Sequence, residues 1–288
     1  MSTYKKLTLI TVTYNSNKEI FHLMKSLKFI ENGIKEIIIV DNNSVIFEPK
    51  KIKKLSNKIK IIQNKQNVGF AKAVNQGIKI SKSDFILLLN PDTYLMDSSI
   101  LKSFDSIQKN KKIGIIGGKI KYPNNKPYLT ANTKPTFLTG LFEFTNLKKI
   151  FPKNKFSKKF WLENYKNIKK PIDVSSLCGA YLIFRKKINK KLNLFDENFF
   201  MYMEDIDFGI KNNKEGYRVV FDPNSQIFHI GGASSNNKYK TSLNYWYKSR
   251  KIFFQKHSNA FEGIILHTIF SIEEIFLKAR NHFHNDFT

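Results

Sequence analysis

Short apolar runs alternate with amphipathic segments along the first half of the chain. Four runs have polar or turn residues on both sides, as is typical of strands buried on both faces of a parallel sheet: 7–12, 37–40, 59–62 and 85–89. Between them, apolar residues recur every three or four positions, as from Ile20 to Ile30, which predicts helices packed on the sheet. This order predicts an α/β fold, with a Rossmann-like, mostly parallel sheet and helices on both faces.

The second half of the chain is less regular. Residues 122–170 are rich in Pro, Asn, Lys and aromatic residues, and we expect Lys148 to Lys170 to be solvated loop. Contact of Lys148 to Lys170 with a membrane interface is the alternative. A strand is expected at 174–184 with the small pair Gly179-Ala180 in its middle, which indicates that a substrate or a backbone lies close.

The C-terminal pattern predicts one more sheet segment and two helices. A short strand is expected at 217–221, and Pro223 should separate it from the apolar residues that follow. Helices are expected at 245–256 and 261–283, and the second is amphipathic and too polar to span a bilayer. It should cover the core or a second copy of the chain, or lie on a membrane. We therefore expect a main domain at 1–240 and a helical extension at 241–288.

The composition is strongly basic. The 49 Lys and Arg against 23 Asp and Glu give a formal charge of +26, which would attract nucleic acid, anionic lipids or nucleotide-linked substrates. An AT-rich genome would produce the same excess of Lys, Asn, Ile and Phe without any binding partner. The single cysteine, Cys178, excludes an internal disulfide and fits a reducing cytoplasm. No secretory signal is visible, so a cytosolic protein is expected.

Polar residues follow directly after the apolar run at 85–89. Pro91 cannot continue a central strand, so Asn90 and Asp92 should lie at the carboxyl edge of the sheet, where open α/β sheets bind ligands. No Gly-x-Gly-x-x-Gly loop is present, so phosphates must be held in another way. A metal ion bound by Asp92 would hold them, although capping of the next helix explains the carboxylate equally well.

Two later segments place polar groups among apolar ones. Residues 195–208 combine aromatic residues with carboxylates, and Glu204-Asp205 reads either as helix capping or as a catalytic base whose pKa is raised by burial. His229 lies in an apolar run and reads either as a core residue or as a ligand beside the following glycine pair, Gly231-Gly232.

The ordered set of these motifs resembles the family-2 glycosyltransferases of GT-A fold, and most closely their rhamnosyltransferase-like branch. The resemblance covers Leu7 to about Arg250. Its motifs are Thr13-Tyr14-Asn15, Val40-Asp41-Asn42-Asn43-Ser44, Asn67 to Asn75, Leu89-Asn90-Pro91-Asp92, Cys178-Gly179-Ala180, Phe195-Asp196-Glu197 to Glu204-Asp205-Ile206-Asp207, and His229 to Ser234.

The resemblance implies an inverting transfer of a sugar, rhamnose being one candidate, from a nucleoside-diphosphate donor to a glycan or lipid-linked glycan acceptor. Asp205 would be the catalytic base, and Asp92 and His229 would bind Mn²⁺ or Mg²⁺. Asn90 replaces the first aspartate of the family's Asp-x-Asp and removes one charge. The residues expected to contact the nucleotide sugar are Thr13, Tyr14, Asp41, Asn67, Gly69, Asn90, Gly179, Ala180, Glu204 and Arg250.

Two other functions compete with this interpretation. A catalytically inactive GT-A scaffold would fit the Asn at position 90, and a nucleic-acid-binding protein would fit the charge. No nucleic-acid-binding motif is present and the basic residues are spread along the chain, so we expect no nucleic-acid partner. A basic cytosolic transferase would concentrate at an anionic membrane, which predicts a place at the inner face of the cytoplasmic membrane.

Overall fold

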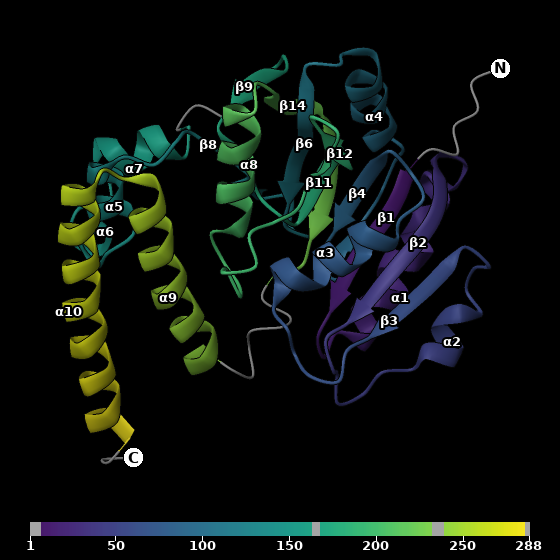
Figure 1. Ribbon diagram of the computed structural model, residues 1–288. Coiled ribbons are helices and arrows are strands. Elements are labelled where there is room, and N and C mark those ends of the chain that lie inside the picture. Colours follow the sequence, from purple (N-terminus) through teal and green to yellow (C-terminus); the bar gives the residue numbers. More distant parts are fainter. Residues whose placement is uncertain (1–6, 163–167, 232–238, 286–288) are drawn as a thin grey trace.

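A computed structural model describes residues 7–162, 168–231 and 239–285. Its first half follows the predicted alternation of strands and helices (Figure 1). The elements are β1 (Leu7–Thr13), α1 (Asn17–Ser26), two 3₁₀ turns (Leu27–Phe29 and Glu31–Gly33), β2 (Ile34–Asp41), α2 (Pro49–Lys53), β3 (Ile59–Gln63), α3 (Phe70–Ile80) and β4 (Phe85–Leu89). The four apolar runs of the sequence thus correspond to the first four strands, β1 to β4.

The central sheet is parallel on one side and mixed on the other. Its strand order is β3-β2-β1-β4-β11-β6-β14-β5, where the later strands are β5 (Thr93–Tyr94), β6 (Ile113–Lys121), β11 (Tyr181–Arg185) and β14 (Arg218–His229). The pairs from β3 to β4 and the pair β6–β14 are parallel, whereas β11 runs antiparallel to both of its neighbours. The prediction of a mostly parallel sheet is confirmed, and the antiparallel strands of this order are β11, which starts at the edge where β4 and β6 end, and the short β5.

Helices cover both faces of the sheet because its strands alternate their apolar side chains. Leu7 and Leu9 of β1 pack with α1 and with α4 (Ile100–Lys109). Ile10 points to the other face, where α3 and α8 (Glu204–Lys214) complete a second apolar cluster. The predicted α/β architecture with helices on both faces is confirmed.

Part of the segment expected to be solvated loop is helical. The chain forms three short helices here, α5 (Phe137–Glu143), α6 (Leu147–Ile150) and α7 (Lys155–Phe160), beside α9 (Tyr239–His257) and α10 (Ala260–Asn285) (Figure 1). The loop prediction was wrong for α6 and α7, because Phe160 is buried in a third cluster with Phe144, Phe254 and Phe270, whereas Phe151 is exposed. Residues 163–167 of the lysine-rich stretch lie outside the described residues.

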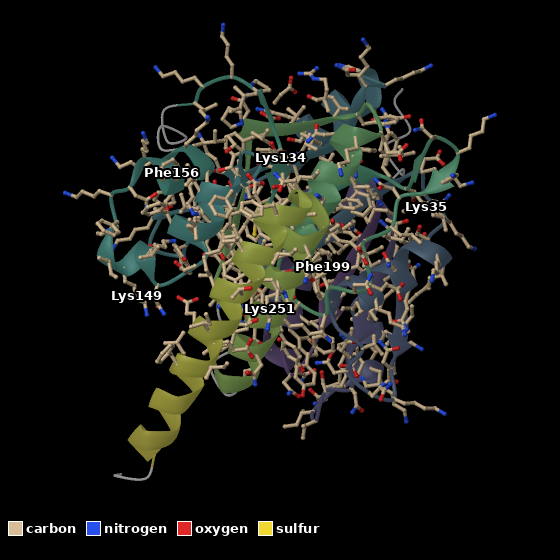
Figure 2. The ribbon with its side chains drawn as sticks, turned by 60° about the vertical axis from the view of Figure 1, so that its left-hand side comes forward. Lys35, Lys134, Lys149, Phe156, Phe199 and Lys251 are labelled. Carbon is tan, nitrogen blue, oxygen red and sulfur yellow. The ribbon has the colours of Figure 1, made fainter. Side chains whose placement is uncertain are left out.

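The C-terminal helices do not pack as a separate unit. Their buried side chains share the third cluster with α5, α7 and the start of α8, so segments from both sides of residue 240 build it. The division into 1–240 and 241–288 remains a prediction. Lys35 and Lys149 extend outward on opposite sides of the molecule (Figure 2), whereas Phe199 is buried in the third cluster. Within the described ranges, no helix is long and apolar enough to cross a membrane.

Two predicted strands have different bounds in the structure. The strand expected at 174–184 is split into β9 (Ile172–Val174), β10 (Ser176–Leu177) and β11, so that Gly179-Ala180 form the turn before β11. The segments expected on either side of Pro223 form one strand, β14, because a bulge absorbs the proline: Asp222 pairs with Gly118 and Gln226 with Lys119. The other short strands are β7 (Pro127–Tyr128), β8 (Ala131–Asn132), β12 (Lys187–Ile188) and β13 (Lys191–Leu192).

Candidate active site

A pocket of about 930 Å³ opens at the carboxyl edge of the sheet, between the sheet and the helical region. Its walls come from the ends of β1, β2, β4 and β14, the turn before β11, the start of α8, and helices α5, α7 and α9. Ten of the predicted site residues line it: Tyr14, Asn67, Gly69, Asn90, Asp92, Gly179, Ala180, Glu204, Asp205 and His229.

Asp92 and His229 meet at one end of this pocket although 137 positions separate them. His229 Nε2 lies 3.0 Å from Asp92 Oδ1, and both side chains are buried. The backbone positions them, because β5 begins directly after Asp92 and pairs with the end of β14, and Ile230 N donates to Asp92 O at 3.0 Å.

This pair fits a divalent cation. It offers a carboxylate oxygen and an imidazole nitrogen, which suit Mn²⁺ in particular. The buried Nδ1 of His229 has no hydrogen-bond partner among the described residues, as is expected where a ligand completes the site. No group of three or more His, Cys, Asp or Glu side chains converges within the described ranges. A cation at this pair would take its other ligands from a bound molecule or water.

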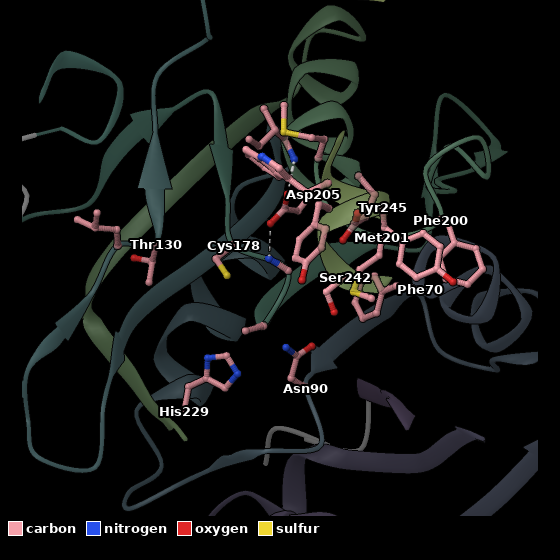
Figure 3. Close-up of a pocket in the computed structure, with 18 of the residues that line it drawn as sticks. Phe70, Asn90, Thr130, Cys178, Phe200, Met201, Asp205, His229, Ser242 and Tyr245 are labelled. Carbon is pink, nitrogen blue, oxygen red and sulfur yellow. Dashed lines mark hydrogen bonds between the residues drawn. The ribbon is translucent and has the colours of Figure 1, made fainter. Parts of the chain in front are cut away.

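Two adjacent carboxylates lie at the start of α8. Asp205 Oδ2 accepts a hydrogen bond from Gly179 N at 2.9 Å (Figure 3), and Oδ1 accepts from Ile206 N at 2.8 Å. Burial raises the pKa of Asp205 despite these bonds. Burial, and then the charge of Asp205, raise the pKa of Glu204 well above its usual value. Glu204 Oε2 is buried with no partner among the described residues.

The backbone before these carboxylates is strained. Tyr202 and Met203 are both left-handed, with φ of 71° and 67°, which is costly for residues other than glycine. Gly69 fits beneath this segment, since a Cβ there would lie 2.7 Å from Phe200 O, to which Phe70 N donates at 2.7 Å. Gly69 therefore packs the start of α3 against the segment that aims Asp205 into the pocket.

Thr13, Asp41 and Arg250 were expected to contact the nucleotide sugar but do not line the pocket. Thr13 is buried in β1. Asp41 is buried at the end of β2 and accepts hydrogen bonds from Ser44, while its neighbour Asn42 reaches the pocket instead.

Arg250 is buried in the helical region rather than in the pocket lining. Its guanidinium is buried, pairs with Glu273 at 2.6 Å and donates to the carbonyl oxygens of Phe144 and Phe270. It also lies over the Phe270 ring, 4.5 Å from the centroid. Arg250 thus joins α9 to α10 and to the end of α5.

Several lining residues had no motif to reveal them. They come mostly from the helical region: Glu143, Phe144, Lys148, Phe160, Trp161, Ser242, Tyr245 and Trp246. The aromatic enrichment of residues 137–161 was the one available signal.

Burial and the Asp205 charge raise the pKa of the Cys178 thiol to about 12, which keeps it protonated and unsuited to act as a nucleophile. Gly232 to Ser234, part of the His229 motif, lie outside the described residues.

The raised pKa of Glu204 predicts a pH-dependent loss of stability. The folded protein binds this proton more tightly than the unfolded chain, so stability should fall as pH rises from 4.5 through the raised folded pKa. Glu204→Gln should therefore be more stable than wild type at about pH 8 and similar near pH 4, each unit of upward shift being worth about 1.4 kcal/mol. Urea unfolding across this range measures the difference, with Glu31→Gln at an exposed site as control. Parallel profiles for E204Q and wild type would contradict the assignment.

The sequence profile described as glycosyl transferase family 2 matches residues 8–192. One relative is the N-acetylglucosaminyl-diphospho-decaprenol L-rhamnosyltransferase of Mycobacterium tuberculosis. It is 25% identical over 264 residues, which cover 88% of this chain and 85% of the relative.

Two solved structures share the fold. A mannosyltransferase from Pyrobaculum calidifontis in complex with GDP-Man and Mn²⁺ superposes with a TM-score of 0.58 at 14% identity, over 91% of this chain and 68% of its own. GalNAc-T7 with UDP, GalNAc and Mn²⁺ gives a TM-score of 0.56 at 14% identity, over 78% of this chain and 43% of its own. With the family profile covering more than half of the sequence, the chain belongs to glycosyl transferase family 2 and has the GT-A fold.

Proposed function

We propose that this protein is a metal-dependent, inverting glycosyltransferase that moves a sugar from a nucleoside diphosphate to a hydroxyl of a growing cell-surface glycan. The observation that supports this most is the shared pocket: a metal-competent pair, Asp92 and His229, and a buried carboxylate, Asp205, line the same cavity. A leaving group and a base on separate walls are what a single displacement needs.

The chemistry at Asp205 is general-base catalysis. Its carboxylate takes the proton of an acceptor hydroxyl as that oxygen bonds to the anomeric carbon, and the bond from this carbon to the donor phosphate breaks. The nucleoside diphosphate leaves with the bonding electron pair from the opposite face, so the configuration inverts. The hydrogen bond from Gly179 N orients the carboxylate, and its raised pKa makes it a stronger base.

Asp92 and His229 would hold Mn²⁺ or Mg²⁺ for the donor. The cation would neutralise charge that develops on the departing diphosphate. Asn90, which replaces a family aspartate, lines the pocket beside this pair and offers an amide to a donor hydroxyl. At the ends of β1 and β2, Tyr14 and Asn42 face the same space and are the groups we assign to the nucleoside.

We propose a nucleotide-linked deoxysugar, with rhamnose as first choice, as donor and a lipid-linked glycan as acceptor. This rests on the mycobacterial relative, whose name specifies an L-rhamnosyltransferase acting on N-acetylglucosaminyl-diphospho-decaprenol.

A lipid-linked acceptor places the protein at the inner face of the cytoplasmic membrane. Helix α10 has an apolar surface for this contact, because Phe261, Ile264, Ile275 and Phe276 are each at least two-thirds exposed. Their spacing puts them on one stripe of the helix. With a chain charge of +26, this stripe suits an anionic bilayer surface.

Metal and donor binding can be tested together by thermal stability. At about 100 times Kd, the matching nucleoside diphosphate with Mn²⁺ should raise the Tm by roughly 5 °C, because it binds only the folded state. Asp92→Ala should abolish the metal-dependent part of the shift, whereas Asp205→Asn should keep it. A screen of UDP, dTDP and GDP in which no diphosphate stabilises wild type would remove the transferase proposal.

The base assignment predicts a different defect for Asp205→Asn. An amide cannot accept the proton, so kcat should fall by about 10²–10⁴ while donor affinity stays near that of wild type. Release of nucleoside diphosphate in the presence of acceptor measures turnover. A variant with wild-type kcat, or one that fails to bind the donor, would show that Asp205 is not the base.

Membrane contact through α10 predicts charge-sensitive binding to vesicles. The double change Ile264→Asp and Ile275→Asp should lower the fraction bound to phosphatidylglycerol vesicles at least about tenfold, since each buried isoleucine contributes roughly 1.5–3 kcal/mol. Flotation measures this fraction. Ile46→Asp, at an equally exposed isoleucine in the loop between β2 and α2, is the matched control. Equal binding by the double variant and wild type would rule out this surface.

A further inference from the structure

The pocket has a second half that the donor chemistry does not use. Beyond Asp205, its walls are aromatic and come from the helical region and from the strained segment before α8. The residues are Phe144, Phe160, Trp161, Tyr202, Tyr245 and Trp246. Trp246 stacks on Phe144, with ring centroids 5.5 Å apart and an angle of 21°, and Tyr202 meets Trp246 edge-on at 6.0 Å. Five of these rings therefore pack against one another, and the sixth, Tyr245, stacks on Phe200.

One buried carboxylate lies within this aromatic wall. The Glu143 side chain is 4% exposed and lines the pocket. Its Oε1 accepts hydrogen bonds from Trp161 Nε1 at 2.7 Å and from Lys148 Nζ. Its Oε2 is buried and has no partner among the described residues. A buried acceptor oxygen without a partner costs free energy, and a ligand hydroxyl would recover it.

Building on the transferase function above, we propose that this aromatic half is the acceptor subsite and that it takes a pyranose ring. A ring hydroxyl donates to Glu143 Oε2, and an apolar face of the sugar lies on an indole. Pyranoses match such a site because their rings have C–H groups on the faces and hydroxyls at the edge, and aromatic faces carry partial negative charge.

The two halves of the pocket come from different parts of the fold. The metal-competent pair and the residues at the ends of β1 and β2 lie on the sheet side, whereas Glu143 and the two tryptophans come from the helices. In a single displacement the attacking hydroxyl approaches the anomeric carbon from the face opposite the leaving group, with the base beside it. The donor is assigned to the sheet side of the pocket, so the acceptor lies on the helical side. Glu143 and its aromatic neighbours therefore bind the acceptor.

Both tryptophans of the chain line this subsite, so their emission reports on it directly. We would titrate the full-length protein with monomeric hexyl pyranosides, namely the glucoside, galactoside, mannoside, rhamnoside and N-acetylglucosaminide. At least one should change the emission saturably. Glu143→Gln keeps the size of the side chain but loses the anionic acceptor, and should weaken this binding roughly 10- to 100-fold. Trp246→Ala should also weaken it, and Glu31→Gln should not.

Donor binding serves as the internal reference. The Tm shift with nucleoside diphosphate and Mn²⁺ should be the same for E143Q and wild type, which shows that the variant is folded and that the donor half is intact. If the diphosphate binds wild type but no pyranoside changes the emission, or if E143Q binds pyranoside like wild type, the subsite assignment is overturned. A loss of diphosphate binding in E143Q would assign this half to the donor instead. Failure of the transferase function itself would appear separately, as a wild-type protein that no diphosphate stabilises.

Discussion

The direction of the strands around β4 is the constraint on which the site depends. β1, β2, β4, β6 and β14 run the same way, so their carboxyl ends meet at one edge, and β11 starts from that edge. The two-residue strand β5 then turns back to pair with the end of β14. This backbone pairing, rather than any side-chain contact, brings Asp92 to His229.

Burial determines what the polar groups at this edge can do. Asp205 and Glu204 lie in the same pocket wall, and removal from water raises both pKa values. Asp205 is held in place by backbone donors, including Gly179 N, which fixes its orientation without neutralising its charge. Among the described residues Glu204 Oε2 has no hydrogen-bond donor, so burial of its charged form costs more free energy than burial of the Asp205 carboxylate. Left-handed residues immediately before the helix add strain to the same few positions.

The helical region completes the pocket because it is anchored to the sheet domain through one aromatic cluster. Phe199 and Ile206 flank the carboxylates and pack with Phe254 and Phe270 of the C-terminal helices. Arg250 strengthens this contact by pairing with Glu273 across α9 and α10. At the first turn of α8, the buried Asp207 accepts from His257 and pairs with Lys256 at the end of α9. The first turn of α8, which bears Asp205, is thus fixed by the apolar contacts of Ile206 and by the polar contacts of Asp207.

Local sequence determined the alternating fold, the family and the position of the strand-end polar residues, because apolar runs, Pro91 and the acidic start of α8 act over a few residues. It also placed Asp92, His229 and Asp205 among the candidates, but it could not choose between a capping and a catalytic carboxylate. Only the tertiary structure decided which groups meet. Arg250 and Glu143 show why: each is defined by partners from separate elements, and Phe144, which accepts from Arg250, lies 106 positions away. A charged residue among aromatic ones has the same local pattern whether it supports a core or faces a ligand, and the packing of distant helices settles the difference.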